Sequence, residues 1–171
     1  PKAVPKPLDG IGALDALKAE NGIILNWTKS KQDDIDSYSI YYSENDFSGK
    51  KISDIKKDES IKKILVDIES SIKIDNIDLT KCDFNPIGSP CKYSGFNNPL
   101  LTDKLYYSRS NNKFIYLIKD ANLMDEKQYY FAVTAVNSQG EISNDKSIEG
   151  NTYILGEGKN YLKVIPKDDL A

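Results

Sequence analysis

The sequence predicts an all-β fold, an antiparallel β-sandwich enlarged by an inserted segment, and three observations support this prediction. Short segments alternate apolar and polar residues, as strands with one buried face do. Turn signals such as Asn21-Gly22 separate these segments. In residues 123–143, Leu123 lies six positions before Tyr129 and an alternating segment follows. This spacing is typical of a tyrosine corner that leads into a strand of a Greek-key sandwich.

The first three strands follow from alternation and turn residues. A segment starting at Leu14 and a segment at 23–28 flank Asn21-Gly22, which predicts a hairpin. Residues 29–36 are polar and predict a loop, and residues 38–43 alternate again as a third strand. The expected core is the set of apolar residues on the inward face: Leu14, Ile23, Leu25, Trp27, Tyr38, Ile40, Leu123, Tyr129, Phe131, Val133 and Ala135.

An insertion of about 70 residues, 44–113, separates the third strand from the corner, although such a sandwich needs only about 100 residues in all. Residues 53–63 predict a short helix, and residues 64–68 are β-branched and predict a strand. Residues 105–109 and 113–118 predict a hairpin. Because its apolar content is low for a separate core, we expect the insertion to extend one sheet of the sandwich.

Several motifs together resemble a fibronectin type III domain, a member of the immunoglobulin-like β-sandwiches. The motif Leu14-Asp15-Ala16 and the segment IILNWT at 23–28 resemble its strands A and B, and IDSYSIYYS at 35–43 resembles strand C. Residues 123–140 resemble the E–F corner, strand F and the F–G turn, and residues 143–152 would be strand G. The resemblance covers about residues 8–45 and 112–152 and implies a module that binds or spaces.

Both ends of the chain extend this domain, which we place at residues 11–152. Residues 1–10 hold three prolines and are expected to form an extended linker in a mature form or a piece of a longer protein. Residues 153–171 form a C-terminal extension in which residues 160–165 predict one more strand. This strand either adds to the edge of the sandwich in the same chain or is donated to a neighbouring subunit by β-augmentation.

Composition excludes several classes of function. The net charge of −3 and a single arginine, Arg109, argue against nucleic-acid binding. The sequence holds no apolar run long enough for a membrane-spanning helix, so we expect no membrane insertion. It also holds no histidine, which removes the usual general base, and it shows no nucleophile or phosphate-binding motif. We therefore expect no enzyme activity and no cofactor.

Two sets of residues are candidates for cross-linking or metal binding. Cys82 and Cys91 lie in one Gly/Pro-rich segment and predict a local disulfide in an oxidising compartment, the alternative being two free thiols. Asp33, Asp34 and Asp36 offer oxygen ligands for Ca²⁺ at short spacing. The favoured interpretation of these aspartates is a hydrophilic turn with local hydrogen bonds, so no metal site is expected.

Tyrosine is abundant, with eleven in the chain, and some aromatic residues are candidates for a binding surface. Tyr93, Phe96, Tyr106 and Tyr107 lie in or after the segment bounded by the cysteines, where they would either recognise a protein or glycan or cover the inserted strands. Asn26 belongs to the only Asn-x-Ser/Thr sequence and should face away from Trp27, which makes it a glycosylation candidate.

The expected function is a non-catalytic interaction or structural module. We expect it in a secreted or surface-exposed microbial protein, as an extracellular filament, adhesion or surface-layer component that contacts a protein partner or itself. The alternative is a carbohydrate-binding accessory module of a larger secreted hydrolase, which requires aromatic side chains exposed along one face. The insertion and the C-terminal strand are the expected contact surfaces.

Overall fold

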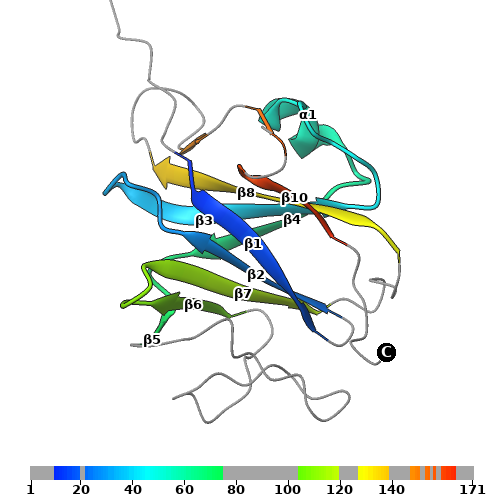
Figure 1. Ribbon diagram of the computed structural model, residues 1–171. Coiled ribbons are helices and arrows are strands. Elements are labelled where there is room, and N and C mark those ends of the chain that lie inside the picture. Colours follow the sequence, from blue (N-terminus) through cyan, green and yellow to red (C-terminus); the bar gives the residue numbers. More distant parts are fainter. Residues whose placement is uncertain are drawn as a thin grey trace, which may run out of the picture.

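The protein is an all-β sandwich of two sheets that pack face to face (Figure 1). The structure is a computed structural model, and it describes residues 10–19, 22–74, 104–119, 127–138, 147–150, 153–154, 156 and 159–164. All statements below concern these residues. One short helix accompanies the strands and lies on the side of one sheet that faces away from the other sheet.

Sheet A has five strands in the order β1-β2-β7-β6-β5. Their bounds are β1 Gly12–Ala19, β2 Gly22–Thr28, β7 Lys113–Lys119, β6 Leu105–Ser108 and β5 Ile72–Ile74. The predicted β1–β2 hairpin is present, but its pairing places Ala19 opposite Gly22, so Gly22 is the first residue of β2 and does not belong to the connection; a bulge interrupts β1 between Gly12 and Asp15. Neighbouring strands are antiparallel except β5 and β6, which are parallel.

Sheet B has the strand order β10-β8-β3-β4, and β9 also pairs with β8. The bounds are β10 Tyr161–Val164, β8 Tyr129–Ser138, β3 Ile35–Ser43, β4 Lys62–Asp67 and β9 Ser147–Glu149. All five pair antiparallel with their neighbours. The helix α1, Ile52–Lys57, connects β3 to β4 and packs over one end of this sheet.

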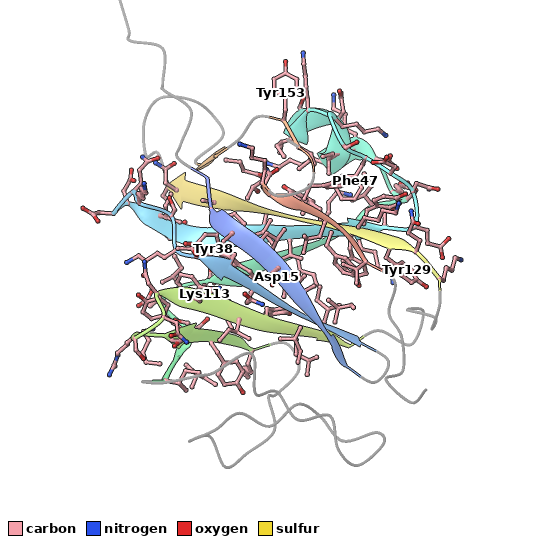
Figure 2. The ribbon with its side chains drawn as sticks, in the orientation of Figure 1. Asp15, Tyr38, Phe47, Lys113, Tyr129 and Tyr153 are labelled. Carbon is pink, nitrogen blue, oxygen red and sulfur yellow. The ribbon has the colours of Figure 1, made fainter. Side chains whose placement is uncertain are left out.

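The main core lies between the two sheets. Every expected core residue that the structure describes is buried there, and the set comprises Leu14, Ile23, Leu25, Trp27, Tyr38, Ile40, Tyr129, Phe131, Val133 and Ala135. The ring of Trp27 meets Tyr38 edge-on at 5.4 Å and stacks on Phe114 at 6.2 Å. Tyr38 thereby joins the two sheets, and Figure 2 shows it between them. Leu123 lies outside the described residues.

A second core forms on the outer side of sheet B, beneath α1. Ile52 and Ile55, three positions apart on α1, pack with Phe47 and Tyr161. No side chain caps the first turn of α1, so this helix is held mainly by its packing. Gly49 N–H donates to the carbonyl of Ile154 at 2.8 Å, which ties the start of the insertion to the C-terminal extension.

The expectation that the insertion extends a single sheet is wrong, because the insertion extends both. Its strand β4 adds to sheet B next to β3, whereas β5 and β6 add to sheet A next to β7. The predicted hairpin is present as β6–β7, and the helix predicted at 53–63 is present but shorter, as α1, because β4 already begins at Lys62. The inserted residues therefore widen the sandwich on both layers, and α1 covers part of the outer face of sheet B.

Candidate interaction surface

The outer face of sheet B carries an open cleft of about 450 Å³. Alternation along β3 sends Tyr38, Ile40 and Tyr42 into the main core, so the residues between them face outward. The register then places outward residues of β4, β3 and β8 in rows across the sheet. The cleft is lined by Asp36, Ser37, Ser39, Tyr41, Lys56, Lys63, Ile64, Leu65, Asp67, Val136, Ser138 and Glu149.

The floor of the cleft contains a buried carboxylate, that of Glu149 at the end of β9. The hydroxyl of Tyr41 donates to this carboxylate and lies 2.9 and 2.7 Å from its two oxygens. The hydroxyl of Thr134 donates to Oε2 at 2.8 Å, and Lys56 of α1 forms an ion pair with Oε1 at 2.8 Å. Residues from β3, β8 and α1 thus converge on one side chain of β9 that is only 7% exposed.

The contacts around Glu149 give it a structural role. Its carboxylate already accepts hydrogen bonds from Tyr41 and Thr134 and pairs with Lys56, which satisfies a buried charge. Burial, followed by the charge of Glu149 and the hydrogen bond to it, raises the pKa of Tyr41, so its hydroxyl stays a donor at neutral pH. The network fastens β9 and α1 to the middle of sheet B.

Buried tyrosines predict that the fold loses stability in alkaline solution. Burial raises the pKa of Tyr38 to about 12, and it also raises the pKa values of Tyr41 and Tyr161. Below about pH 10 both folded and unfolded chains keep these hydroxyls protonated, so the stability is fully present. Above about pH 10 the unfolded chain ionises first, and stability falls until the pH passes the folded pKa.

For Tyr38 alone the expected loss between about pH 10 and pH 12 is about 2–3 kcal/mol. Urea unfolding at a series of pH values measures this loss. Tyr38→Phe serves as the matched variant and should show a shallower alkaline slope than the parent chain. A free energy of unfolding that stays constant across this interval would contradict the prediction.

The edge of the cleft is formed by β4, which is the last of the described strands on that side of sheet B. Leu65, in the middle of β4, is 65% exposed and faces outward beside Lys63 and Asp67. Val66, its neighbour in sequence, faces the main core. Among the large apolar side chains that the structure describes as exposed, Leu65 is the most exposed, ahead of Tyr153 (45%) and Ile72 (36%).

The aspartates considered as Ca²⁺ ligands form hydrogen bonds to the end of β8. Asp34 Oδ2 accepts from the side-chain amide of Asn137 at 2.8 Å, and Asp36 Oδ2 accepts from the hydroxyl of Ser138 at 2.6 Å. Asp33 is exposed. Within the described residues no three acidic, cysteine or histidine side chains gather into a metal-binding group. The carboxylates of Asp34 and Asp36 thus connect the β2–β3 loop to β8.

The described aromatic candidates do not form a binding surface. Tyr106 lies on β6, between β5 and β7, and is 1% exposed. Of the two roles considered for it, recognition of a partner and covering of the inserted strands, its burial agrees with the second. Tyr107 is half-buried: its ring packs on Phe114 at 4.7 Å, and its hydroxyl donates to Asn112 Oδ1 at 2.8 Å. Both side chains are used in packing the widened sheet A. Tyr93 and Phe96 lie outside the described residues.

Two further predictions concern covalent modification. Asn26 lies opposite in phase to Trp27 on β2, as expected, but it is 2% exposed. Glycosylation needs an accessible side-chain amide, and the folded chain does not offer one at Asn26. Cys82 and Cys91 lie outside the described residues, and their disulfide stays a prediction.

The C-terminal strand is present as β10 and pairs with β8 of the same chain, from Tyr161 opposite Ala132 to Val164 opposite Tyr129. The hydroxyl of Tyr161 donates to Asp46 at 2.6 Å and accepts from the N–H of Phe47 at 3.1 Å. Donation of this strand to another subunit would require these contacts to be broken in the monomer and remade between chains.

Comparisons of the chain with family models, with curated proteins and with solved structures give no match. In the part of the chain that the structure describes, no helix combines the length and the apolar character needed to cross a membrane.

Proposed function

We propose that this chain is a non-catalytic protein-interaction module of a secreted or surface-exposed microbial protein. The observation that carries the proposal is Leu65, which is 65% exposed at the centre of an edge strand and beside an open cleft. Edge strands present unpaired backbone groups to other chains, and an exposed apolar side chain adds area that a partner can bury.

The strand arrangement supports the resemblance to a fibronectin type III domain. In that comparison β1, β2 and β7 take the positions of strands A, B and E, and they are neighbours in sheet A. β3, β8 and β9 take the positions of strands C, F and G, and they are neighbours in sheet B. This division into two sheets matches the one expected of an immunoglobulin-like sandwich, a scaffold that serves mainly for binding and spacing.

The surface supports protein binding over carbohydrate binding. Carbohydrate modules stack sugar rings on exposed aromatic side chains, which must follow one face. Among the described aromatic residues, Tyr153 is exposed (45%), and Figure 2 shows it projecting outward beside α1. A single exposed ring does not provide the row of aromatic side chains that stacking along a carbohydrate chain requires. Leu65, by contrast, lies among the charged side chains of Lys63 and Asp67, a combination typical of protein contacts.

Site-specific photo-crosslinking tests this function. A benzophenone amino acid replaces Leu65 in one variant and Tyr153 in a control variant, and both are applied to intact surfaces of the producing cells. We expect protein adducts, identified by mass spectrometry, from position 65 and far fewer from position 153. A parallel glycan array should show no binding. Absence of any protein adduct at position 65, or saturable glycan binding, would overturn the proposal.

A further inference from the structure

We propose that β4 is a self-complementary edge, at which two copies of this chain pair antiparallel about a two-fold axis that passes through Leu65. The pairing would join two copies of sheet B into one continuous sheet. This inference rests on the proposed interaction function and names its partner, a second copy of the same chain. It is carried by the backbone geometry of β4 and by the order of charges along the strand.

The direction of the backbone groups along β4 can be read from its pairing with β3. Ile68 N–H, just after the strand, donates to the carbonyl of Asp36 on the β3 side at 3.0 Å. Because backbone groups alternate sides along a strand, the even-numbered residues of β4 bond to β3. The N–H and C=O groups of Lys63, Leu65 and Asp67 therefore point away from β3, toward the outer edge. Among the described strands, β4 pairs only with β3.

One register fits these outward groups to a second copy. If Leu65 lies opposite Leu65 of the second copy, Lys63 lies opposite Asp67, and Asp67 lies opposite Lys63. Residues directly opposite each other across an antiparallel pair lie on the same face of the sheet, and all three of these residues face outward. The outward backbone groups would then form about six hydrogen bonds between the copies, and the carbonyl of Asp67 would share or exchange its 3.2 Å contact with the hydroxyl of Ser70.

The side chains favour this register over its neighbours. It forms two pairs of opposite charge, one at each end, and it buries the two exposed leucines against each other. Shifting the axis to Ile64 would leave both charges without an opposite partner. Shifting it to Val66 would place Asp67 opposite Leu65, and Lys63 would meet Glu69, which lies in the turn beyond the end of β4. A parallel arrangement in register would place Lys63 opposite Lys63 and Asp67 opposite Asp67, which is repulsive.

The lysines of β4 need separate consideration, since lysine on an edge strand often prevents pairing. Lys63 Nζ donates to the carbonyls of Asp58 and Ile61 at 2.8 and 2.9 Å, and its side chain is exposed. An exposed ammonium can exchange these contacts for a carboxylate without being desolvated deeply. In the proposed register Lys63 meets a carboxylate, so it selects the antiparallel partner and does not block it.

The other sheet edges are less suited to pairing. β5 and β10 are short, with three and four residues. β1 is longer, but a bulge between Gly12 and Asp15 interrupts it, and Ala13 there has a φ of 42°. Bulges and short strands are features by which proteins protect edges from pairing. β4 has six residues, and its register with β3 is unbroken.

Sedimentation velocity over a range of concentrations tests the proposal with the full chain. The parent chain should show a monomer–dimer equilibrium with a Kd on the order of 10–100 μM, as expected of a small interface. Lys63→Asp places two acidic pairs across the axis, and Asp67→Lys places two basic pairs there. Each variant alone should dimerise about tenfold or more weakly than the parent chain.

Mixing these two variants gives the sharpest result. In a heterodimer the aspartate introduced by Lys63→Asp faces the lysine introduced by Asp67→Lys. The unchanged Asp67 of the first variant faces the unchanged Lys63 of the second, so both charge pairs return. We therefore expect the mixture to dimerise although each variant alone does so only weakly.

Further variants serve as controls for this experiment. Lys31→Asp and Asp33→Lys are matched controls, because both change an exposed charge in the loop between β2 and β3, away from β4, and they should leave the dimer unchanged. Leu65→Glu is an independent variant at an exposed site and should abolish the dimer. Circular dichroism and thermal melting confirm that each variant is folded.

Several outcomes would overturn the β4 pairing. These are a parent chain that remains monomeric up to about 1 mM, single variants that dimerise as well as the parent, and a mixture that stays monomeric. The outcome also separates this inference from the function on which it rests. A monomeric chain that still forms adducts with a different protein at position 65 would overturn the pairing only. A dimer that forms no adduct with any other protein on cells would support the pairing and contradict only the proposed contact with a second kind of protein.

Discussion

Replacing Trp27 with alanine is expected to lower the free energy of unfolding by about 3–5 kcal/mol. Trp27 is fully buried on β2, where its ring contacts Tyr38 from sheet B and Phe114 from sheet A. Truncation would open a cavity at the point where three aromatic rings join the two layers. For a chain of this size the melting temperature should fall by about 6–20 °C, measured by circular dichroism.

Two variants serve as controls for this prediction. In the described part of the chain Trp27 Nε1 has no hydrogen-bond partner, so Trp27→Phe removes an unsatisfied donor together with some packing. Its expected destabilisation is smaller, about 1–2 kcal/mol. Tyr153→Ala, at an exposed aromatic residue, should change stability by no more than about 0.5 kcal/mol. If Trp27→Ala melted within a degree or two of the parent chain, the ring would not hold the sheets together.

The alternation of apolar and polar residues is sufficient to predict which side chains face the core between the two sheets. The strand expected at 38–43 is part of β3, and its inward residues Tyr38 and Ile40 lie in the main core. The same holds for Leu25 and Trp27 on β2 and for Phe131 on β8. These positions are predictable because one buried face repeats every second residue, which is a local signal.

The placement of the inserted strands is not predictable in the same way. Both β4 and β6 are predicted as strands from their local sequence, yet β4 joins sheet B and β6 joins sheet A. Which sheet a strand joins depends on contacts between segments far apart in the sequence, and local pattern does not encode them. Tyr106 shows the consequence. It is a surface candidate by sequence, but its side chain is 1% exposed, on the face of β6 opposite to Leu105, which packs in the main core.

The cleft on sheet B cannot be predicted from the sequence for a related reason. Tyr41 and Glu149 are 108 positions apart, and no motif links them. Alternation along β3 does indicate that Tyr41 faces away from Tyr38 and Ile40, which is the one local signal present. Leu65 has a signal as well, since an apolar residue between charged Lys63 and Asp67 on one face breaks the expected pattern of a solvent-exposed edge.

Replacing Glu149 with alanine is expected to destabilise the fold by about 2–4 kcal/mol, because it leaves buried donors without an acceptor. The hydroxyls of Tyr41 and Thr134 both donate to this carboxylate, and these residues are 2% and 0% exposed. Lys56 contributes less, since its side chain is 52% exposed and water can replace its partner. Lys56→Ala should therefore cost no more than about 1 kcal/mol in urea unfolding.

A double-mutant cycle identifies the hydrogen bond as the cause. In the parent chain Tyr41→Phe removes a donor from a buried carboxylate and should be destabilising. In the Glu149→Ala background the hydroxyl has lost its carboxylate acceptor and keeps only the neighbouring hydroxyls of Ser39 and Thr134, so the same change should cost much less. The double variant is then less destabilised than the sum of the two single variants. Equal effects of Tyr41→Phe in both backgrounds would show instead that Tyr41 and Glu149 stabilise the sheet independently.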